Sequence, residues 1–149
     1  MRIIVDGDGC AGKSIIENIA KKYDLPVIIY CDIHHRISSN YSTVKIVDDG
    51  FQSVDMYVIN ECRKNDIVVT QDYGVAAMSL GKKAFSINPK GYIYTNENID
   101  RLLFERHLNQ KARKAGLRGK NPAKRSKEDD ERLLINLSKL IENMKKSQG

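Results

Sequence analysis

The sequence predicts an α/β fold of three layers, in which a mostly parallel sheet is covered by helices on both faces. Short β-branched apolar runs alternate along residues 1–95 with segments of helical periodicity, a pattern typical of parallel strands joined by crossover helices. Right-handed connections place such helices on both faces. The length of 149 residues suits one domain. From about residue 96 the pattern is purely helical, so we expect one domain with an α/β core over 1–95 and a C-terminal helical extension over 96–149.

The first unit is strand, helix, strand. Residues 2–6 (RIIVD) form an apolar run that ends in Gly-Asp-Gly, which is typical of a buried strand that gives way to a loop. Ile16 and Ile19 then belong to an apolar set with helical spacing. Pro26 prevents that helix from continuing into the strand expected at 27–31.

The alternation of strands and helices continues through the middle of the chain. Turn-forming residues separate the segments, and Asn-Pro-Lys-Gly closes the last of the parallel strands. In chain order, the elements expected here are a strand at 44–47, a helix that Ser53 caps and that runs to about residue 64, a strand at 67–70, a short helix at 74–80, a strand at 84–87 and an edge strand at 92–95.

Two helices are expected after residue 95. In the first, the apolar face that includes Leu103 continues at Leu108 on a shifted line, so the sequence leaves its docking surface open. In the second, Ser126 and Asp129 resemble a capping box with Asp in place of Glu. This helix has an apolar stripe that predicts packing onto the domain, formed by Leu133, Leu134, Leu137, Leu140, Ile141 and Met144.

The composition excludes several classes of protein. No apolar run approaches the roughly 18 residues that cross a bilayer, and no signal-like core precedes Asp6. The three cysteines, Cys10, Cys31 and Cys62, are odd in number and far apart, so they predict neither a disulfide framework nor a zinc knuckle. We therefore expect a cytoplasmic protein with no membrane partner.

Positive charge is concentrated in one segment. Residues 106–127 hold nine Lys or Arg and no Asp or Glu, whereas the rest of the chain holds 16 basic and 19 acidic residues. Such a segment indicates a polyanionic partner, because neutralised phosphates release counterions; a merely solvated tail is the alternative. The predicted nucleic-acid-binding residues are Arg106, Lys111, Arg113, Lys114, Arg118, Lys120, Lys124 and Arg125.

The loop after the first strand is compatible with three chemistries. Residues 7–14 (GDGCAGKS) match the phosphate-loop pattern between a strand and a helix. Asp6 and Asp8 argue against a nucleotide hydrolase, because their carboxylates would repel a triphosphate. The same two acids fit the D-x-D of haloacid-dehalogenase-type phosphatases. That family also needs a late acidic pair after a strand, and the adjacent Asp pairs in this sequence are Asp48-Asp49 and Asp129-Asp130, the second at a helix start.

The third chemistry is a carboxylate site for a divalent cation. Asp6 and Asp8 lie two residues apart at a strand end, and ligands of open parallel sheets gather at the carboxyl ends of strands. Asp72 follows another strand and joins them if the two strands are neighbours. Asp55 suits either this site or the first turn of a helix. Oxygen ligands of this kind favour Mg²⁺ or Mn²⁺.

Taken together, the motifs resemble a known family. The succession IIVDGDGC, GFQSVD, NDIVVTQDYGVAA and INPKGYIYT, with a basic tail and an acidic-capped last helix, resembles the YaiI/YqxD family of bacterial proteins over nearly the whole chain. The resemblance implies a PIN-like fold, which is the fold of metal-dependent nucleases that cut RNA with clustered acidic residues.

The family pattern transfers to individual residues. Its D-x-D falls on Asp6 and Asp8, its mid-chain Asp on Asp55, and its Thr-x-Asp on Thr70 and Asp72. This chain departs from the family at positions 7, 9 and 11, where it has Gly, Gly and Ala in place of Ala, Ala and Pro. Gly12, Lys13 and Ser14 complete the phosphate-loop string, and the glycines at positions 7 and 9 also loosen the loop that holds Asp8.

The leading hypothesis is therefore a Mg²⁺- or Mn²⁺-dependent phosphodiesterase acting on RNA. In it the four aspartates hold the metal, and Thr70 or Ser14 orients a ligand or phosphate. A non-catalytic module that binds RNA or a ribonucleoprotein is the rival from another class, and a phosphate-loop hydrolase is the third hypothesis. His34 and His35 are expected in a solvent-exposed loop, without a ligand role.

Overall fold

The computed structural model describes residues 1–48, 53–116 and 124–148, with the backbone alone at residues 8–10 and 148. It contains a six-stranded sheet with the order β3-β2-β1-β4-β5-β6. The five strands other than β6 pair in parallel, and β6 adds an antiparallel edge. The strands are β1 (Ile3–Asp6), β2 (Val27–Asp32), β3 (Thr43–Val47), β4 (Ile67–Val69), β5 (Phe85–Ile87) and β6 (Ile93–Tyr94). The predicted mostly parallel sheet is confirmed.

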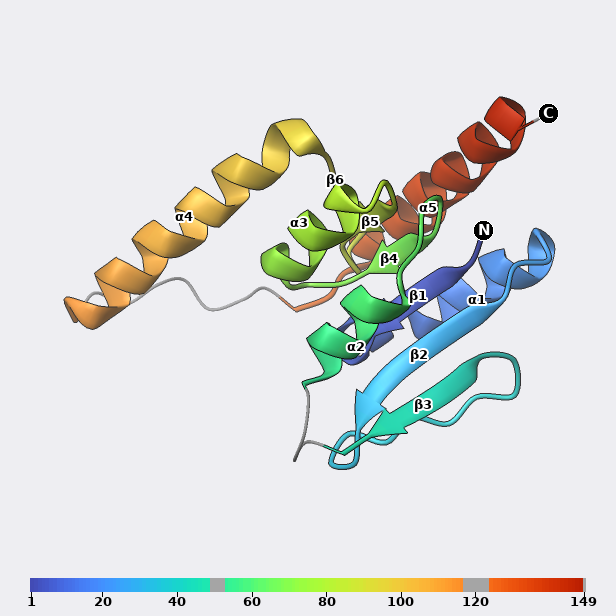
Figure 1. Cartoon of the computed structure of the whole chain (residues 1–149), viewed down its shortest axis with the longest axis horizontal. Coiled ribbons are helices and arrows are strands. Elements are labelled where there is room, and N and C mark those ends of the chain that lie inside the picture. The colour runs from blue at the N-terminus through green and yellow to red at the C-terminus, as the bar shows by residue number, and fades with distance from the viewer. Residues whose placement is uncertain (49–52, 117–123, 149) are drawn as a thin grey trace.

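Helices cover both faces of this sheet (Figure 1). On one face, α1 and α5 pack together over Ile3 and Val5. On the other, α2 and α3 lie over Ile4 and Val68, and α4 packs on α3. The helices are the 3-10 helix η1 (Gly7–Gly12), α1 (Lys13–Lys22), α2 (Val54–Glu61), α3 (Tyr73–Gly81), α4 (Asn96–Lys114) and α5 (Lys127–Gln148). The predicted α/β class with three layers is confirmed.

The last helix belongs to the main core. Leu133, Leu137 and Ile141 are fully buried against β1 and α1 residues. The predicted capping box is present, because the Ser126 amide donates to Asp129 Oδ2 at 3.0 Å and the Asp129 amide donates to Ser126 Oγ at 3.3 Å. Half of the Leu134 side chain is exposed, so the buried stripe is narrower than predicted.

Two predicted local features differ from the structure. The segment after β1 is not a loop but a 3-10 helix, η1. Its first residue is Gly7, where a Cβ would lie only 2.9 Å from the Tyr30 carbonyl oxygen, so glycine allows this close approach to β2. Ser53 does occupy the N-cap of α2, but its side chain makes no capping hydrogen bond. That helix ends at Glu61 rather than near residue 64, because Asp66 Oδ2 accepts from the Arg63 amide at 2.9 Å and closes a turn.

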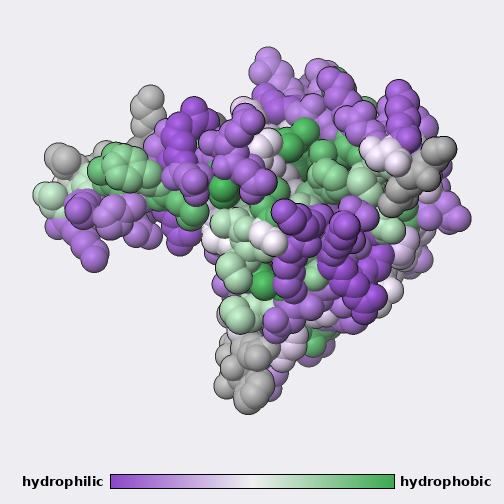
Figure 2. All heavy atoms as spheres, turned by 45° about the horizontal axis from the view of Figure 1, so that its top comes forward, coloured by the Kyte–Doolittle hydropathy of each residue, from purple (hydrophilic) through white to green (hydrophobic). Residues whose placement is uncertain are grey.

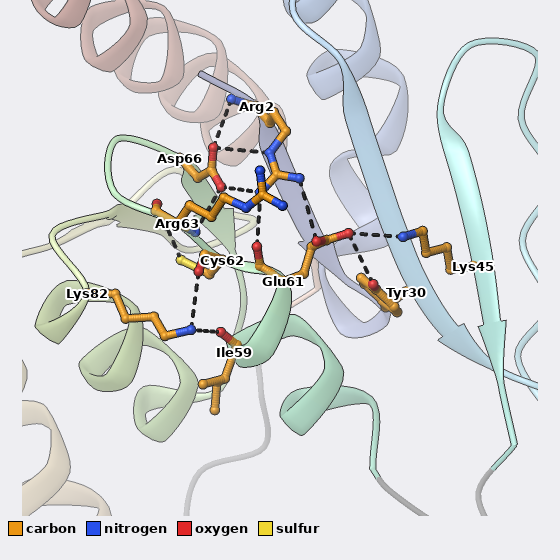
Figure 3. Close-up of polar contacts among 9 residues, drawn as sticks. All are labelled: Arg2, Tyr30, Lys45, Ile59, Glu61, Cys62, Arg63, Asp66 and Lys82. Atoms are coloured by element: carbon orange, nitrogen blue, oxygen red, sulfur yellow. Dashed lines mark hydrogen bonds and ion pairs between the residues drawn. The ribbon is translucent and has the colours of Figure 1, made fainter.

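A polar network fixes the C-terminal end of α2 at the amino edge of the sheet (Figure 3). Arg2 Nη2 donates to Asp66 Oδ2 at 2.7 Å and to the Glu61 carbonyl at 2.9 Å. Glu61 Oε1 accepts from Lys45 Nζ at 3.0 Å and from the Tyr30 hydroxyl at 3.2 Å. The network therefore links β1, β2, β3 and α2, and leaves the other end of α2 at the carboxyl edge.

The connections diverge at the centre of the sheet. From β1 the chain crosses to β2 on one side, and after α2 it enters the sheet again as β4 on the other side of β1. In open parallel sheets, ligands bind outside the carboxyl ends of the strands at such a switch point. No helix in the described part of the chain is long and apolar enough to span a membrane.

Candidate acidic site

A cleft of about 410 Å³ opens at the switch point, and we call it the acidic cleft. It lies at the carboxyl ends of β1 and β2, below the N-terminus of α2. Most of its polar wall consists of carboxylates, and its polar side chains are Asp6, Asp32, His35, Ser53, Asp55 and Asp72.

The structure brings three of the four predicted acids to this cleft. Asp6, Asp55 and Asp72 come from β1, α2 and the start of α3, respectively, and line one cavity. Asp8 belongs to η1, but its side chain lies outside the described residues. Among the side chains that the structure describes, no three His, Cys, Asp or Glu residues are grouped closely enough to hold one metal ion.

Thr70 connects two of these acids. Its hydroxyl donates to Asp6 Oδ2 at 2.9 Å and accepts from the Asp72 amide at 3.0 Å. Asp6 is only 4% exposed and Thr70 is fully buried. Because burying an ionised carboxylate is costly without hydrogen bonds, Thr70 both stabilises and orients Asp6. The sequence analysis expects Thr70 or Ser14 to orient a ligand or phosphate, and in the structure Thr70 orients the carboxylate of Asp6.

Asp72 combines a structural contact with a place on the cleft. Its Oδ1 caps α3 by accepting from the amides of Gly74 at 2.7 Å and Val75 at 3.2 Å. The same oxygen lies 3.7 Å from Arg106 Nη1. No described residue forms a hydrogen bond with Asp72 Oδ2. The capping contacts therefore occupy one oxygen and fix the direction of the other.

Asp55 enters the cleft from the first turn of α2. Its Oδ1 accepts from the Met56 amide at 3.0 Å, as expected for an acid near a helix N-terminus. Ser53 and Val54 line the cleft beside it. The predicted helix-dipole role and the predicted place at the site are thus compatible.

Asp32 is an acid of the cleft that the sequence analysis did not select. It ends β2, and its Oδ1 accepts from the amides of His34 at 2.9 Å and His35 at 2.8 Å and contacts His35 Nδ1 at 3.0 Å. The His35 contact, together with the two amides, lowers the pKa of Asp32 below its ordinary value. Its signal was available, since an Asp directly follows an apolar run there, as it does at Asp6.

Comparison with known proteins places this chain in a family. The family model described as "Uncharacterized BCR, YaiI/YqxD family" matches residues 4–143. The chain belongs to the YaiI/YqxD family. A UPF0178 protein of Clostridium perfringens (strain SM101) is 64% identical over 145 residues, which are 97% of each chain. A UPF0178 protein of Clostridium kluyveri (strain ATCC 8527) is 62% identical over 149 residues, which are 100% of this chain and 98% of that one.

One solved structure also matches. It is that of Rae1 (YacP) from Bacillus subtilis, as a W164L mutant, with 15% sequence identity and a TM-score of 0.45 over 87% of this chain and 90% of that chain.

Of the phosphate-loop residues whose side chains the structure describes, 7 and 11–14, Gly7 alone lines the acidic cleft of this YaiI/YqxD chain. Residues 7–12 form η1, and Lys13 Nζ donates to the Ser38 carbonyl in the loop between β2 and β3. Ser14 is exposed on α1 and is not among the residues that line the cleft. The structure thus brings Thr70, but not Ser14, to the predicted acids.

The predicted basic residues occupy different environments. Arg106 lies beside Asp72, whereas Lys111, Arg113 and Lys114 are exposed near the end of α4, and Lys124 is exposed before α5. Arg118 and Lys120 lie outside the described residues.

Arg125 has a structural role in the fold. Its Nε lies 2.7 Å from Asp130 Oδ1 and its Nη1 donates to the Pro89 carbonyl at 2.8 Å. Arg125 therefore joins the turn after β5 to the start of α5.

Proposed function

We propose that this YaiI/YqxD protein is a divalent-metal-dependent phosphodiesterase with a PIN-like acidic site, acting on nucleic acid and in particular on RNA. One observation carries the proposal. Asp6, Asp55 and Asp72 come from three separate elements and line one cleft at the switch point of the sheet, together with Asp32. Carboxylate oxygens are the ligands that Mg²⁺ and Mn²⁺ prefer.

The acidic residues fit such an ion chemically. Asp6 is buried and ionisable, and a cation in the cleft would lower the cost of keeping it charged. Asp72 Oδ2 and the carboxylate of Asp55 supply further hard oxygen atoms, and we assign Asp8 to the same set. A bound Mg²⁺ or Mn²⁺ would activate water and stabilise charge that develops on phosphorus oxygens.

The residues around the acids then have distinct roles. Thr70 holds Asp6 in one orientation through its hydroxyl. Arg106, 3.7 Å from Asp72, can contact a phosphate that enters the cleft. The exposed lysines and arginines of α4 would neutralise the nucleic-acid backbone further away.

A non-catalytic nucleic-acid-binding module is the second candidate. It is favoured by the finding that the described side chains do not group three metal-binding residues tightly. The phosphate-loop hydrolase has less support, because the Lys13 ammonium that would bind phosphate donates to Ser38 instead.

Metal binding is the first test. We expect chelator-treated protein to bind Mn²⁺ saturably in calorimetry, and Asp72→Asn to weaken binding by about 10- to 100-fold. Asn caps helices as well as Asp does, so this variant keeps α3 intact. Asp24→Asn is the matched control, because it removes the same charge from an exposed turn before β2 where Asn tolerates the φ of 56°.

Cleavage of a fluorescently labelled single-stranded RNA is the second test. The proposal requires turnover with Mn²⁺, none with chelator, and loss of turnover in Asp6→Asn protein that keeps its circular dichroism spectrum. RNA binding in chelator without cleavage under Mg²⁺ or Mn²⁺ would instead support the binding module.

A further inference from the structure

A groove leads away from the acidic cleft along residues 71–73. Asp72 borders both the acidic cleft and a hollow of about 250 Å³ that Arg106 also lines. Gln71 and Tyr73 border that hollow and a second one of about 240 Å³, which Lys90 and Arg125 line. We call the two hollows together the basic groove. Each hollow shares at least one lining residue with the next, so the cleft and the two hollows are neighbours on the surface.

The charge of the walls changes sign along this path. Among the described side chains, four aspartates line the acidic cleft, whereas the basic groove has Arg106, Lys90 and Arg125 and, of the acids, only Asp72. Asp130 lies just outside, paired with Arg125 Nε. If a nucleic-acid strand placed one phosphodiester at the aspartates, the phosphates of its neighbouring nucleotides would lie beside these cations.

Arg125 adds a fixed positive charge to the wall of this groove. Asp130 and the Pro89 carbonyl bind its Nε and Nη1, but no described residue accepts a hydrogen bond from its buried Nη2. The Nη2 atom itself is enclosed beside Gly12, so the one-fifth-exposed guanidinium contributes its positive charge to the groove and offers no free donor there.

Lys90 is presented by a rigid turn. Asn88 Oδ1 accepts from the Lys90 amide at 2.7 Å, and the Gly91 amide donates to the Asn88 carbonyl at 2.8 Å. Gly91 has a φ of 91°, and a Cβ there would lie 2.4 Å from the Leu133 nitrogen, so only glycine lets the turn press against α5. Arg132 of α5 then donates to the Lys90 carbonyl at 3.1 Å.

Tyr73 stands between the two hollows with a fixed ring. It makes an edge contact with Tyr94 at a centroid distance of 5.8 Å and an interplanar angle of 71°. Tyr94 is itself held, because its hydroxyl donates to the Thr70 carbonyl at 3.2 Å and accepts from Asn88 Nδ2 at 3.1 Å. A partly exposed aromatic ring between cationic side chains is the arrangement on which nucleobases stack.

We propose that the basic groove is a nucleotide subsite, in which Tyr73 stacks a base and Lys90 binds the adjoining phosphate, with the charge of Arg125 nearby. The inference rests on the proposed function, and it adds the path that the nucleic acid takes and two residues, Tyr73 and Lys90, that contact it. Each hollow is smaller than the roughly 300–1,000 Å³ of common ligand pockets, which suits single units of an unpaired strand.

Binding measured without turnover tests the subsite. The probe is a 12-nucleotide fluorescein-labelled oligouridylate in chelator, followed by fluorescence anisotropy. We expect Tyr73→Ala to weaken binding about 5- to 100-fold and Tyr73→Phe to retain it, because the ring does the stacking. Lys90→Ala should weaken binding and lower the slope of log K against log salt by about one.

Two matched controls do not line the groove. Tyr92→Ala removes an exposed tyrosine that stacks on Arg132, and Lys64→Ala removes an exposed lysine outside the groove; both should bind as wild type does. Normal binding by Tyr73→Ala and Lys90→Ala, or no binding by the wild type, would overturn the subsite.

The outcomes separate the two proposals. Binding that depends on Tyr73, without cleavage under Mn²⁺, would support the subsite and contradict the phosphodiesterase. RNA cleavage under Mn²⁺, with oligouridylate binding that Tyr73→Ala and Lys90→Ala leave unchanged, would support the phosphodiesterase and contradict the subsite.

Discussion

Thr70 is the residue on which the geometry of the candidate site depends most directly. Its buried hydroxyl donates to Asp6 and accepts from the Asp72 amide. Thr70→Val keeps the shape but removes both hydrogen bonds, and we expect it to lower the free energy of unfolding by about 1–3 kcal/mol. Urea denaturation measures this loss.

Thr70→Ser is the control for the hydroxyl. It keeps the donor and loses one methyl group, so it should be more stable than Thr70→Val. If the valine variant proves the more stable of the two, packing rather than hydrogen bonding determines stability at this position.

Tyr94 gives the protein a pH dependence at high pH. Burial raises the pKa of its hydroxyl to about 12, against the opposing contact with Asn88. The unfolded chain loses this proton near pH 10 and the folded chain near pH 12. The unfolded state therefore binds fewer protons between these values, and the free energy of unfolding falls as pH rises through this window.

Comparison with Tyr94→Phe isolates this effect. The phenylalanine variant is expected to be less stable near pH 8, because the Thr70 carbonyl and Asn88 lose a partner, but to lose less further stability from pH 10 to pH 12. Parallel falls in the two proteins would assign the alkaline loss to other groups.

For individual residues, the sequence predicted where the acids lie better than it predicted which residues pair with one another. Asp6 and Asp72 could be placed because an acid at the end of a buried run marks the carboxyl edge of a parallel sheet. The pairing of Arg125 with the Pro89 carbonyl could not, because it joins residues 36 positions apart and depends on how α5 docks. Asp32 was missed because the strand predicted at 27–31 ended one residue before it, whereas β2 includes it.

Among the elements, α4 differs most from its neighbours. It forms an arm that projects from the body, with hydrophobic residues on its surface (Figures 1 and 2). Its first turns pack on α3, but Phe104 is 61% exposed and Leu108 is 48% exposed. Residues 104–114 are exposed throughout, apart from Ala112, which is intermediate.

This arm should open more easily than the rest of the fold. An isolated helix shorter than about 12–15 residues is marginal in water, so we expect amides in 104–114 to exchange with deuterium at least about 100-fold faster than those around Leu137. Hydrogen exchange followed by mass spectrometry measures both segments at once. Equal protection would mean that another surface covers the arm in solution.

The elements were predictable to different degrees. Strands and helices of the sheet were placed within a few residues, because burial imposes strict periodicity on them. The η1 helix was not predicted, because Gly-Asp-Gly is typical of a loop and the close approach of Gly7 to the Tyr30 carbonyl on another strand cannot be seen in the sequence. The shift of the apolar face at Leu108 correctly indicated that the packing of this helix changes there, because it marks where α4 leaves the body.

Across the whole molecule, α5 connects the core to the groove. Its buried side chains lie among residues of β1, β2 and α1. Its exposed flank binds the turn after β5, where Asn136 Nδ2 donates to the Gly91 carbonyl at 2.7 Å. A helix that begins only at residue 127 therefore supports both the sheet and the position of Lys90.

The contribution of α5 to stability can be measured with two substitutions on the same helix. Leu137 is fully buried, so Leu137→Ala should lower the free energy of unfolding by about 2–5 kcal/mol. Leu134 is half exposed, so Leu134→Ala should lower it by less than about 1 kcal/mol. Both changes replace Leu by Ala within α5, so their difference in urea denaturation reports burial rather than helix propensity. Equal losses would show that α5 does not pack on the sheet in solution, and the rigid presentation of Lys90 would then be contradicted as well.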